Sequence, residues 1–175
     1  MRRVVVTGIG LVSAFGCDAE TIWRALCAGD SATRALDDID GNRSVRVIGA
    51  PVSGFSAREY IDGKSLRLMA PAVAYGVAAA ELAARDSGRD FAAVDPTRLG
   101  AFVGSRGHSS DRQELLAAVR LATENGHFRL DRYGAEGLAR VHPMWLLKGL
   151  ANNVLYFISL KYNAQGMNPF NVADP

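Results

Sequence analysis

Few side chains in this 175-residue chain have the type and spacing needed for chemistry. Of its two cysteines, Cys17 precedes a predicted helix, where the helix dipole can lower a thiol pKa and raise its reactivity. We interpret Cys17 instead as a small turn residue and Cys27 as a core residue on an apolar helix face. The two thiols form no C-x-x-C pair, so we do not expect redox or metal chemistry from them.

The three histidines, His108, His127 and His142, are too far apart for the H-E-x-x-H pair of a zinc enzyme. No G-x-S-x-G segment marks the nucleophile of a hydrolase. The sequence therefore predicts no metal site and no bound cofactor, and it disfavours a hydrolase.

Two glycine-containing segments are similar to phosphate-binding turns. Gly8-Ile9-Gly10 follows a short apolar run, as in the dinucleotide-binding motif G-x-G-x-x-G, but Ser13 stands at the third glycine position. Gly63-Lys64-Ser65 is similar to the end of a P-loop, but Arg58 stands where the first glycine belongs. We favour a turn at a strand end for Gly8 and Gly10, and keep a nucleotide-binding α/β domain as an alternative.

Predicted strands and helices alternate along the chain. Asp18 and Gly29 cap a short amphipathic helix, and an alanine-rich helix extends over 66–86 with Pro71 in its first turn. The β-branched run Val4-Val5-Val6 predicts a strand buried on both faces. Further strands are expected at 45–48, 98–105 and 168–173, a helix at 111–125, and a partly helical apolar wall at 144–147 and 154–158. This order predicts an α/β fold with a mostly parallel sheet flanked by helices.

Composition fits one globular domain over residues 1–175, with 49% hydrophobic and 22% charged residues. The formal charge of +2 is nearly balanced and no basic run occurs, so nucleic acid is not an expected partner. No apolar run reaches the roughly 18 residues that cross a membrane. We therefore expect a cytoplasmic protein with reduced thiols.

The chain resembles the β-ketoacyl-ACP synthase (ketosynthase) family, and three groups of residues carry the resemblance. The first is the opening, Arg3-Val4-Val5-Val6-Thr7-Gly8-Ile9-Gly10-Leu11-Val12-Ser13 with Gly16, Thr21-Ile22-Trp23, Leu26 and Ala28-Gly29. The second is Lys64, Arg67, Met69, Tyr75, Ala78-Ala79-Ala80 and Asp86-Ser87-Gly88, which is similar to the family's long central helix. The third is Arg98-Leu99-Gly100, Val103-Gly104-Ser105, Asn152-Asn153, Ile158-Ser159, Tyr162 and Gly166.

The resemblance covers almost the whole chain but only the first part, under half, of a thiolase-fold condensing enzyme. In that family a cysteine takes the acyl group from acyl carrier protein, and two later histidines assist decarboxylation. Counting from Asn153 and Tyr162 places that cysteine at Pro175. His142 precedes this position, so we interpret it as a loop residue. By the same count Met144 and Trp145 fall on acyl-tunnel positions.

The resemblance implies one of two roles. We expect a catalytically incompetent N-terminal half, either a truncated piece or a partner subunit of an active condensing enzyme, like a chain-length-factor-type subunit, in fatty-acid or polyketide assembly. The alternative is one half of a split ketosynthase whose catalytic residues lie on another chain. Either implies a homo- or hetero-dimer with a ketosynthase-like subunit, and acyl carrier protein as a further partner. The strand at 168–173 would be the dimer edge, although Pro169 weakens it.

Overall fold

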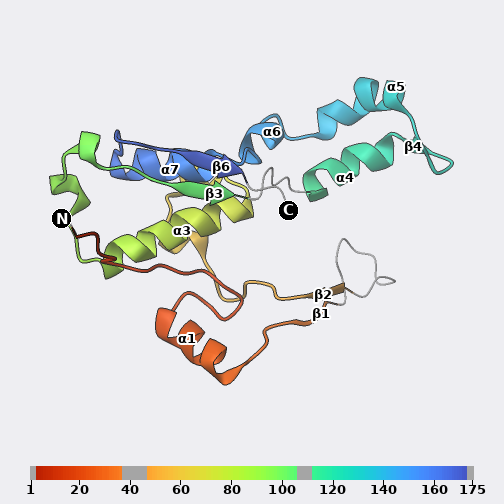
Figure 1. Ribbon diagram of the computed structural model, residues 1–175. Coiled ribbons are helices and arrows are strands. Elements are labelled where there is room, and N and C mark those ends of the chain that lie inside the picture. The colour runs from red at the N-terminus through yellow and green to blue at the C-terminus, as the bar shows by residue number, and fades with distance from the viewer. Residues whose placement is uncertain (1–2, 37–46, 106–111, 173–175) are drawn as a thin grey trace.

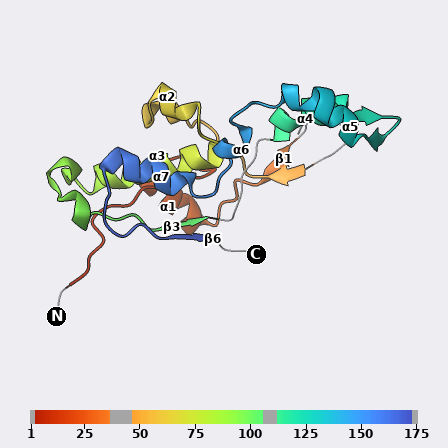
Figure 2. The same cartoon turned by 90° about the horizontal axis from the view of Figure 1, so that it is seen from above.

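The computed structural model describes residues 3–36, 47–105 and 112–172 (Figure 1). Its centre is helix α3 (Pro71–Asp86), which packs against helix α7 (Asn153–Tyr162). Beside the two helices run strands β3 (Val103–Ser105) and β6 (Phe170–Val172), paired in parallel (Figure 2). This layered arrangement of helices and parallel strands confirms the α/β fold class.

The buried core lies between α3, α7 and the segment that precedes α3. It is built from Ile61, Met69, Ala70, Val73, Ala74, Val77 and Phe157, with Ala57, Tyr60, Leu66, Val154 and Ile158 packed around them. The buried residues of α3 recur at the three- and four-residue spacing that places them on one helix face. Their small size lets α7 approach closely, and a Cβ on Gly76 would lie 2.8 Å from a methyl group of Val154.

Helix α3 begins at Pro71, five residues later than the 66–86 range expected from the sequence. Pro71 occupies the first turn, where its missing N–H costs no hydrogen bond. The residues ahead of it form the separate short helix α2 (Gly63–Leu66), because Asp62 accepts hydrogen bonds from its first N–H groups.

Helix α1 (Ala19–Ala28) forms as the sequence predicts. Asp18 accepts a 2.8 Å hydrogen bond from the Thr21 N–H, and Gly29 ends the helix with a φ of 74°. Cys27, however, is exposed, so its interpretation as a core residue is wrong. The reason is that α1 buries Ile22 and leaves much of its apolar face uncovered, including Trp23 at 66% exposure.

Two further strand pairs are antiparallel. Strand β1 (Arg34–Leu36) pairs with β2 (Val47–Gly49), which overlaps the predicted strand at 45–48. Strand β4 (Thr123–Glu124) pairs with β5 (His127–Phe128). The strands are shorter than the sequence suggests, and the predicted strand at 98–105 is reduced to its last three residues in β3.

The largest difference from expectation lies at the N-terminus. Val4, Val5 and Val6 are extended but belong to no strand, and their exposures are 97%, 67% and 83%. The prediction of a strand buried on both faces is therefore wrong for the described residues. A β-branched run favours extended backbone, but only a neighbouring strand turns it into a ladder.

Residues 112–140 form a projecting arm that lies away from the α3–α7 body in both views (Figures 1 and 2). The predicted helix at 111–125 ends early, at Leu121, because Thr123 and Glu124 enter a hairpin whose turn residues, Asn125 and Gly126, adopt positive φ angles of 51° and 79°. The arm consists of α4 (Arg112–Leu121), the β4–β5 hairpin, α5 (Leu130–Arg132), η4 (Tyr133–Gly137) and η5 (Leu138–Arg140).

Helix α6 (Trp145–Lys148) connects the arm back to α7, so the apolar wall predicted at 144–147 and 154–158 is helical. Three short turns complete the described part: η1 (Ala57–Glu59), η2 (Phe91–Ala93) and η3 (Pro96–Arg98). Among the described helices, none is both long enough and apolar enough to cross a membrane.

Candidate functional site

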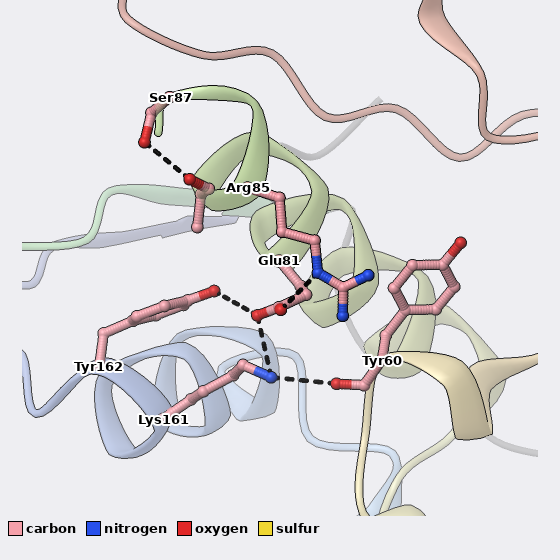
Figure 3. Close-up of polar contacts among 7 residues, drawn as sticks. Tyr60, Glu81, Arg85, Ser87, Lys161 and Tyr162 are labelled. Carbon is pink, nitrogen blue, oxygen red and sulfur yellow. Dashed lines mark hydrogen bonds and ion pairs between the residues drawn. The ribbon is translucent and has the colours of Figure 1, made fainter. Parts of the chain in front are cut away.

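The most connected polar group in the described residues is Glu81, on the face of α3 that meets α7 (Figure 3). Its carboxylate accepts a 2.7 Å hydrogen bond from the Tyr162 hydroxyl and lies 3.0 Å from the Lys161 ammonium. The Arg85 guanidinium donates to the other oxygen at 2.8 Å. Lys161 also donates to the backbone carbonyl of Tyr60 at 3.0 Å, and the Arg85 guanidinium lies 5.5 Å from the Tyr60 ring centroid. We call these five residues the Glu81 junction.

The junction strongly favours the ionised form of Glu81. Burial by itself would raise the pKa of Glu81, but hydrogen bonds from Tyr162, Lys161 and Arg85 outweigh burial and lower it from 4.5 to about 2. Burial and the Glu81 carboxylate together raise the pKa of the Tyr162 hydroxyl, which therefore stays a donor. The junction thus fixes α3, α7 and the Tyr60 segment to one another.

This pKa shift predicts acid sensitivity. Because the pKa is lower in the folded state, the stabilisation is complete above the unfolded value and is lost as pH falls from about 4.3 towards about 2. We expect the free energy of unfolding to drop by about 2 kcal/mol across this window, since Glu81 is partly solvent-screened. Urea denaturation at a series of pH values measures the drop. The Glu81→Gln variant should show a flatter profile, and an equal slope in both proteins would contradict the assignment.

The Gly8-Ile9-Gly10 segment lies against the C-terminal half of α3. A Cβ on Gly8 or Gly10 would overlap backbone atoms of that helix, including the carbonyl oxygens of Ala83 and Ala79. The Ile9 N–H donates to the Asp86 carboxylate at 2.8 Å. Phosphate binding needs free N–H groups and a helix N-terminus, whereas this segment faces a carboxylate and a helix C-terminus. The two glycines therefore serve close packing, and the geometry does not support the nucleotide-binding alternative.

Gly63-Lys64-Ser65 forms the start of α2. The N–H groups of Lys64 and Ser65 both donate to the Asp62 carboxylate, each at 3.0 Å. The Asp62 carboxylate thus accepts the hydrogen bonds that a bound phosphate would need, and its negative charge would repel a phosphate. The segment is a capped helix start.

The two thiols and the two described histidines, His127 and His142, lie in separate parts of the structure. Cys17 is half-buried, and burial together with the nearby Glu59 carboxylate raises the pKa of its thiol, which lowers its reactivity. His127 lies in β5 of the arm, and His142 accepts a 3.1 Å hydrogen bond from the Met144 N–H in a turn, as a loop residue does. His108 and Pro175 lie outside the described residues. Within the described ranges, no three His, Cys, Asp or Glu side chains gather as metal ligands would.

An apolar groove of about 360 Å³ lies between α6, α7 and the segment before α3. Met144 is in its wall, whereas Trp145, the first residue of α6, does not line it. The lining residues are Leu68, Met144, Leu147, Lys148, Leu150, Asn152, Asn153, Tyr156 and Phe157. Asn153 braces α6 because its side-chain amide donates to the Leu147 carbonyl at 2.6 Å.

The scaffold is that of a known protein family. Residues 1–170 match the family model of the β-ketoacyl synthase N-terminal domain. The chain belongs to the β-ketoacyl synthase family. The resemblance to the ketosynthase family is thereby confirmed.

Curated relatives include 3-oxoacyl-[acyl-carrier-protein] synthases and a polyketide beta-ketoacyl synthase. The chain is 32% identical to 3-oxoacyl-[acyl-carrier-protein] synthase 2 of Vibrio cholerae over 95% of its own length and 37% of the relative. It is 39% identical to the Granaticin polyketide putative beta-ketoacyl synthase 1 of Streptomyces violaceoruber, over 82% of its own length and 32% of the relative. The chain therefore spans less than half the length of these synthases.

Solved structures agree on the fold. The ishigamide ketosynthase/chain length factor superposes with a TM-score of 0.73 at 22% identity, over 98% of this chain and 40% of that one. A ketosynthase in complex with its type II acyl-carrier protein gives a TM-score of 0.70 at 21% identity, over 97% of this chain and 41% of that one. The described residues thus have the architecture of the first part of a ketosynthase.

Sequence reasoning missed the Glu81 junction. A signal was present, because Glu81 is the one acidic residue inside the alanine-rich run of α3 before its terminal Asp86. A carboxylate amid small apolar residues on a buried helix needs partners. Its partners Lys161 and Tyr162 are some eighty residues away in sequence, however, and no local pattern links them.

Proposed function

We propose that the chain works as a single, non-catalytic ketosynthase-like domain that associates with an active condensing enzyme in fatty-acid or polyketide assembly. The observation that carries the proposal is that the chain has a ketosynthase scaffold, whereas neither of its two thiols is suited to act as the condensing nucleophile. A condensing nucleophile needs a thiolate next to donors for the developing oxyanion. Cys17 has a raised thiol pKa beside Glu59, and Cys27 lies on the exposed side of α1.

Acyl loading tests this proposal directly. We expect no covalent acyl group on the purified chain after incubation with radiolabelled acyl-ACP, because neither thiol is activated. Autoradiography and intact mass give the readout, and a cysteine-containing ketosynthase is the positive control. Label that persists on the wild-type chain and disappears in Cys17→Ser or Cys27→Ser would refute the non-catalytic role.

The proposed partner is a ketosynthase-like subunit, as a homo- or hetero-dimer. Support comes from large apolar side chains left exposed in the described part, among them Phe102 and Met167, each at 72% exposure. Surface of this kind is normally covered in an assembled protein. Similar structures include a ketosynthase/chain length factor and a ketosynthase with its acyl-carrier protein, so we propose carrier protein as a further partner.

Association is measurable by light scattering. We expect the chain to elute as a complex when co-expressed with a cysteine-bearing ketosynthase, and condensation activity to belong to that subunit. The split-ketosynthase alternative predicts activity only when this chain is combined with a complementary part that supplies the cysteine and histidines. If the chain stays monomeric in dilute solution and binds neither the ketosynthase nor the complementary part, the proposed function is contradicted.

We also propose that the groove beside Met144 accepts the apolar part of an acyl chain, with Trp145 supporting the α6 wall. The groove is lined mostly by apolar side chains and closed at one side by α7. The site of action that we propose is the cytoplasm, in keeping with the kinship to carrier-protein-dependent synthases.

A further inference from the structure

An apolar cavity of about 260 Å³ lies between the segment 60–69 and the helices α3 and α7. Four of its lining residues, Ile61, Met69, Val77 and Phe157, are members of the buried core. The cavity therefore reaches the core itself. Protein interiors rarely keep a void much larger than a water molecule, whereas ligand sites are concave, mostly apolar and largely preformed. A cavity of this size and depth has the properties of a binding site.

The cavity adjoins a basic hollow. Ile61 and Asp62 border both the cavity and a more open hollow, whose lining also includes Arg58, Lys64 and Arg67. These three cations are exposed, and within the described ranges none of them forms an ion pair with a carboxylate. Asp62 is the one acidic residue among the described residues that line the hollow. The hollow is therefore positively charged and complementary to an anion.

Side chains, and not the start of α2, are available to hold that anion. The N–H groups of Lys64 and Ser65 already donate to the Asp62 carboxylate, each at 3.0 Å. The negative charge of Asp62 would repel a doubly charged phosphate more strongly than a singly charged carboxylate. An arginine guanidinium, in turn, can hold a carboxylate through two parallel hydrogen bonds. The charges therefore favour a head group with one negative charge.

We propose that the cavity and the adjoining hollow together bind a fatty carboxylate. Its alkyl chain lies in the cavity, and its head group lies among Arg58, Lys64 and Arg67. Since a void of about 150 Å³ can hold a benzene ring, the larger cavity has room for an alkyl chain of about eight carbons. The site shares only Phe157 with the groove beside Met144, and the inference does not depend on the proposed function.

The occupied site would be linked to the Glu81 junction. Tyr60 and Lys161 line the cavity and are also members of the junction, where the Lys161 ammonium donates to the Tyr60 carbonyl (Figure 3). An alkyl chain in the cavity therefore adds contacts between α7 and the segment 60–69. A ligand that binds only the folded chain raises its melting temperature. We expect this rise with a fatty carboxylate.

Isothermal titration of the full chain with sodium octanoate tests the site. We expect saturable binding together with a higher melting temperature. Octylammonium has the same alkyl chain and the opposite charge, so it should bind at least about tenfold more weakly. Butanoate has four fewer methylene groups. Since each buried methylene raises affinity about fourfold, butanoate should bind more than about a hundredfold more weakly than octanoate.

Variants locate the ligand on the chain. Arg58→Glu combined with Arg67→Glu should weaken octanoate binding about tenfold or more, because two attractive charges become repulsive. The matched control, Arg120→Glu combined with Arg140→Glu, changes the net charge equally on the projecting arm and should bind octanoate like the wild type. Ser65→Trp narrows the cavity and should weaken binding as much as the double reversal. Circular dichroism checks that each variant folds.

The outcomes separate this site from the proposed acyl groove. Octanoate binding that is unchanged by the double reversal and by Ser65→Trp, but lost in Met144→Glu, places the alkyl chain in the groove beside Met144 and overturns the inference. Equal affinities for octanoate and octylammonium would overturn it too, because the cations would then hold no head group. The absence of saturable octanoate binding overturns it outright. None of these results bears on association with a ketosynthase-like partner.

Discussion

The Gly10→Ala variant is expected to lose about 3 kcal/mol of folding free energy. A Cβ at this position would overlap the Ala79 carbonyl and the Ala83 backbone, and neither can move without unwinding α3. The extended segment must therefore lift off the helix, which also breaks the hydrogen bond from Ile9 to Asp86. Urea denaturation followed by circular dichroism measures the loss.

Gly134 provides the matched control. It lies in the helical part of the arm, and a Cβ there would meet nothing within 4 Å. Because alanine is a better helix former than glycine, Gly134→Ala should be neutral or stabilising by up to about 1 kcal/mol. Equal effects of the two substitutions would mean that Gly10 is not in close contact with α3.

The Phe157→Ala variant should cost about 3–5 kcal/mol, enough to unfold a domain of ordinary stability. Phe157 is 7% exposed and is the aromatic member of the core between α3 and α7. Its removal leaves a cavity among Val73, Val77 and Met69, which the rigid helix pair fills poorly. Thermal and urea unfolding both report the change.

Leu160→Ala tests the same helix at its outer face. Leu160 is 62% exposed, so the variant should change the free energy of unfolding by no more than about 0.5 kcal/mol. A loss as large as that of Phe157→Ala would contradict the assignment of Phe157 to the core, because alanine is at least as good a helix former as leucine and Leu160→Ala changes only an exposed side chain.

The predictable parts of the fold are those that depend on neighbours in sequence. Asp18 and Gly29 delimit α1 because capping groups act within three or four residues. Pro71 marks the start of α3 for the same reason. The ketosynthase resemblance was equally visible, since the opening motif and central helix keep their order and spacing.

The remaining parts depend on distant or external partners. Val4 to Val6 have strand-forming residues, but a strand also needs a neighbour, which the described residues do not provide. The amphipathic pattern of α1 predicts a core position for Cys27, yet amphipathicity does not say whether a face is covered, and Cys27 is exposed. The Glu81 junction joins α3 to α7 across some eighty residues. The roles of Met144 and Trp145 stay predictions.

The projecting arm has a consequence for folding. Ala118 and Ala122 are fully buried inside it, and its elements pack mainly on one another over short sequence separations. Contacts of this kind form quickly and can open without disrupting the rest of a protein. The arm should therefore behave as a separate foldon. Its amide protons should exchange with solvent through a partial opening reaction, whereas those of α3 and α7 should exchange only through global unfolding.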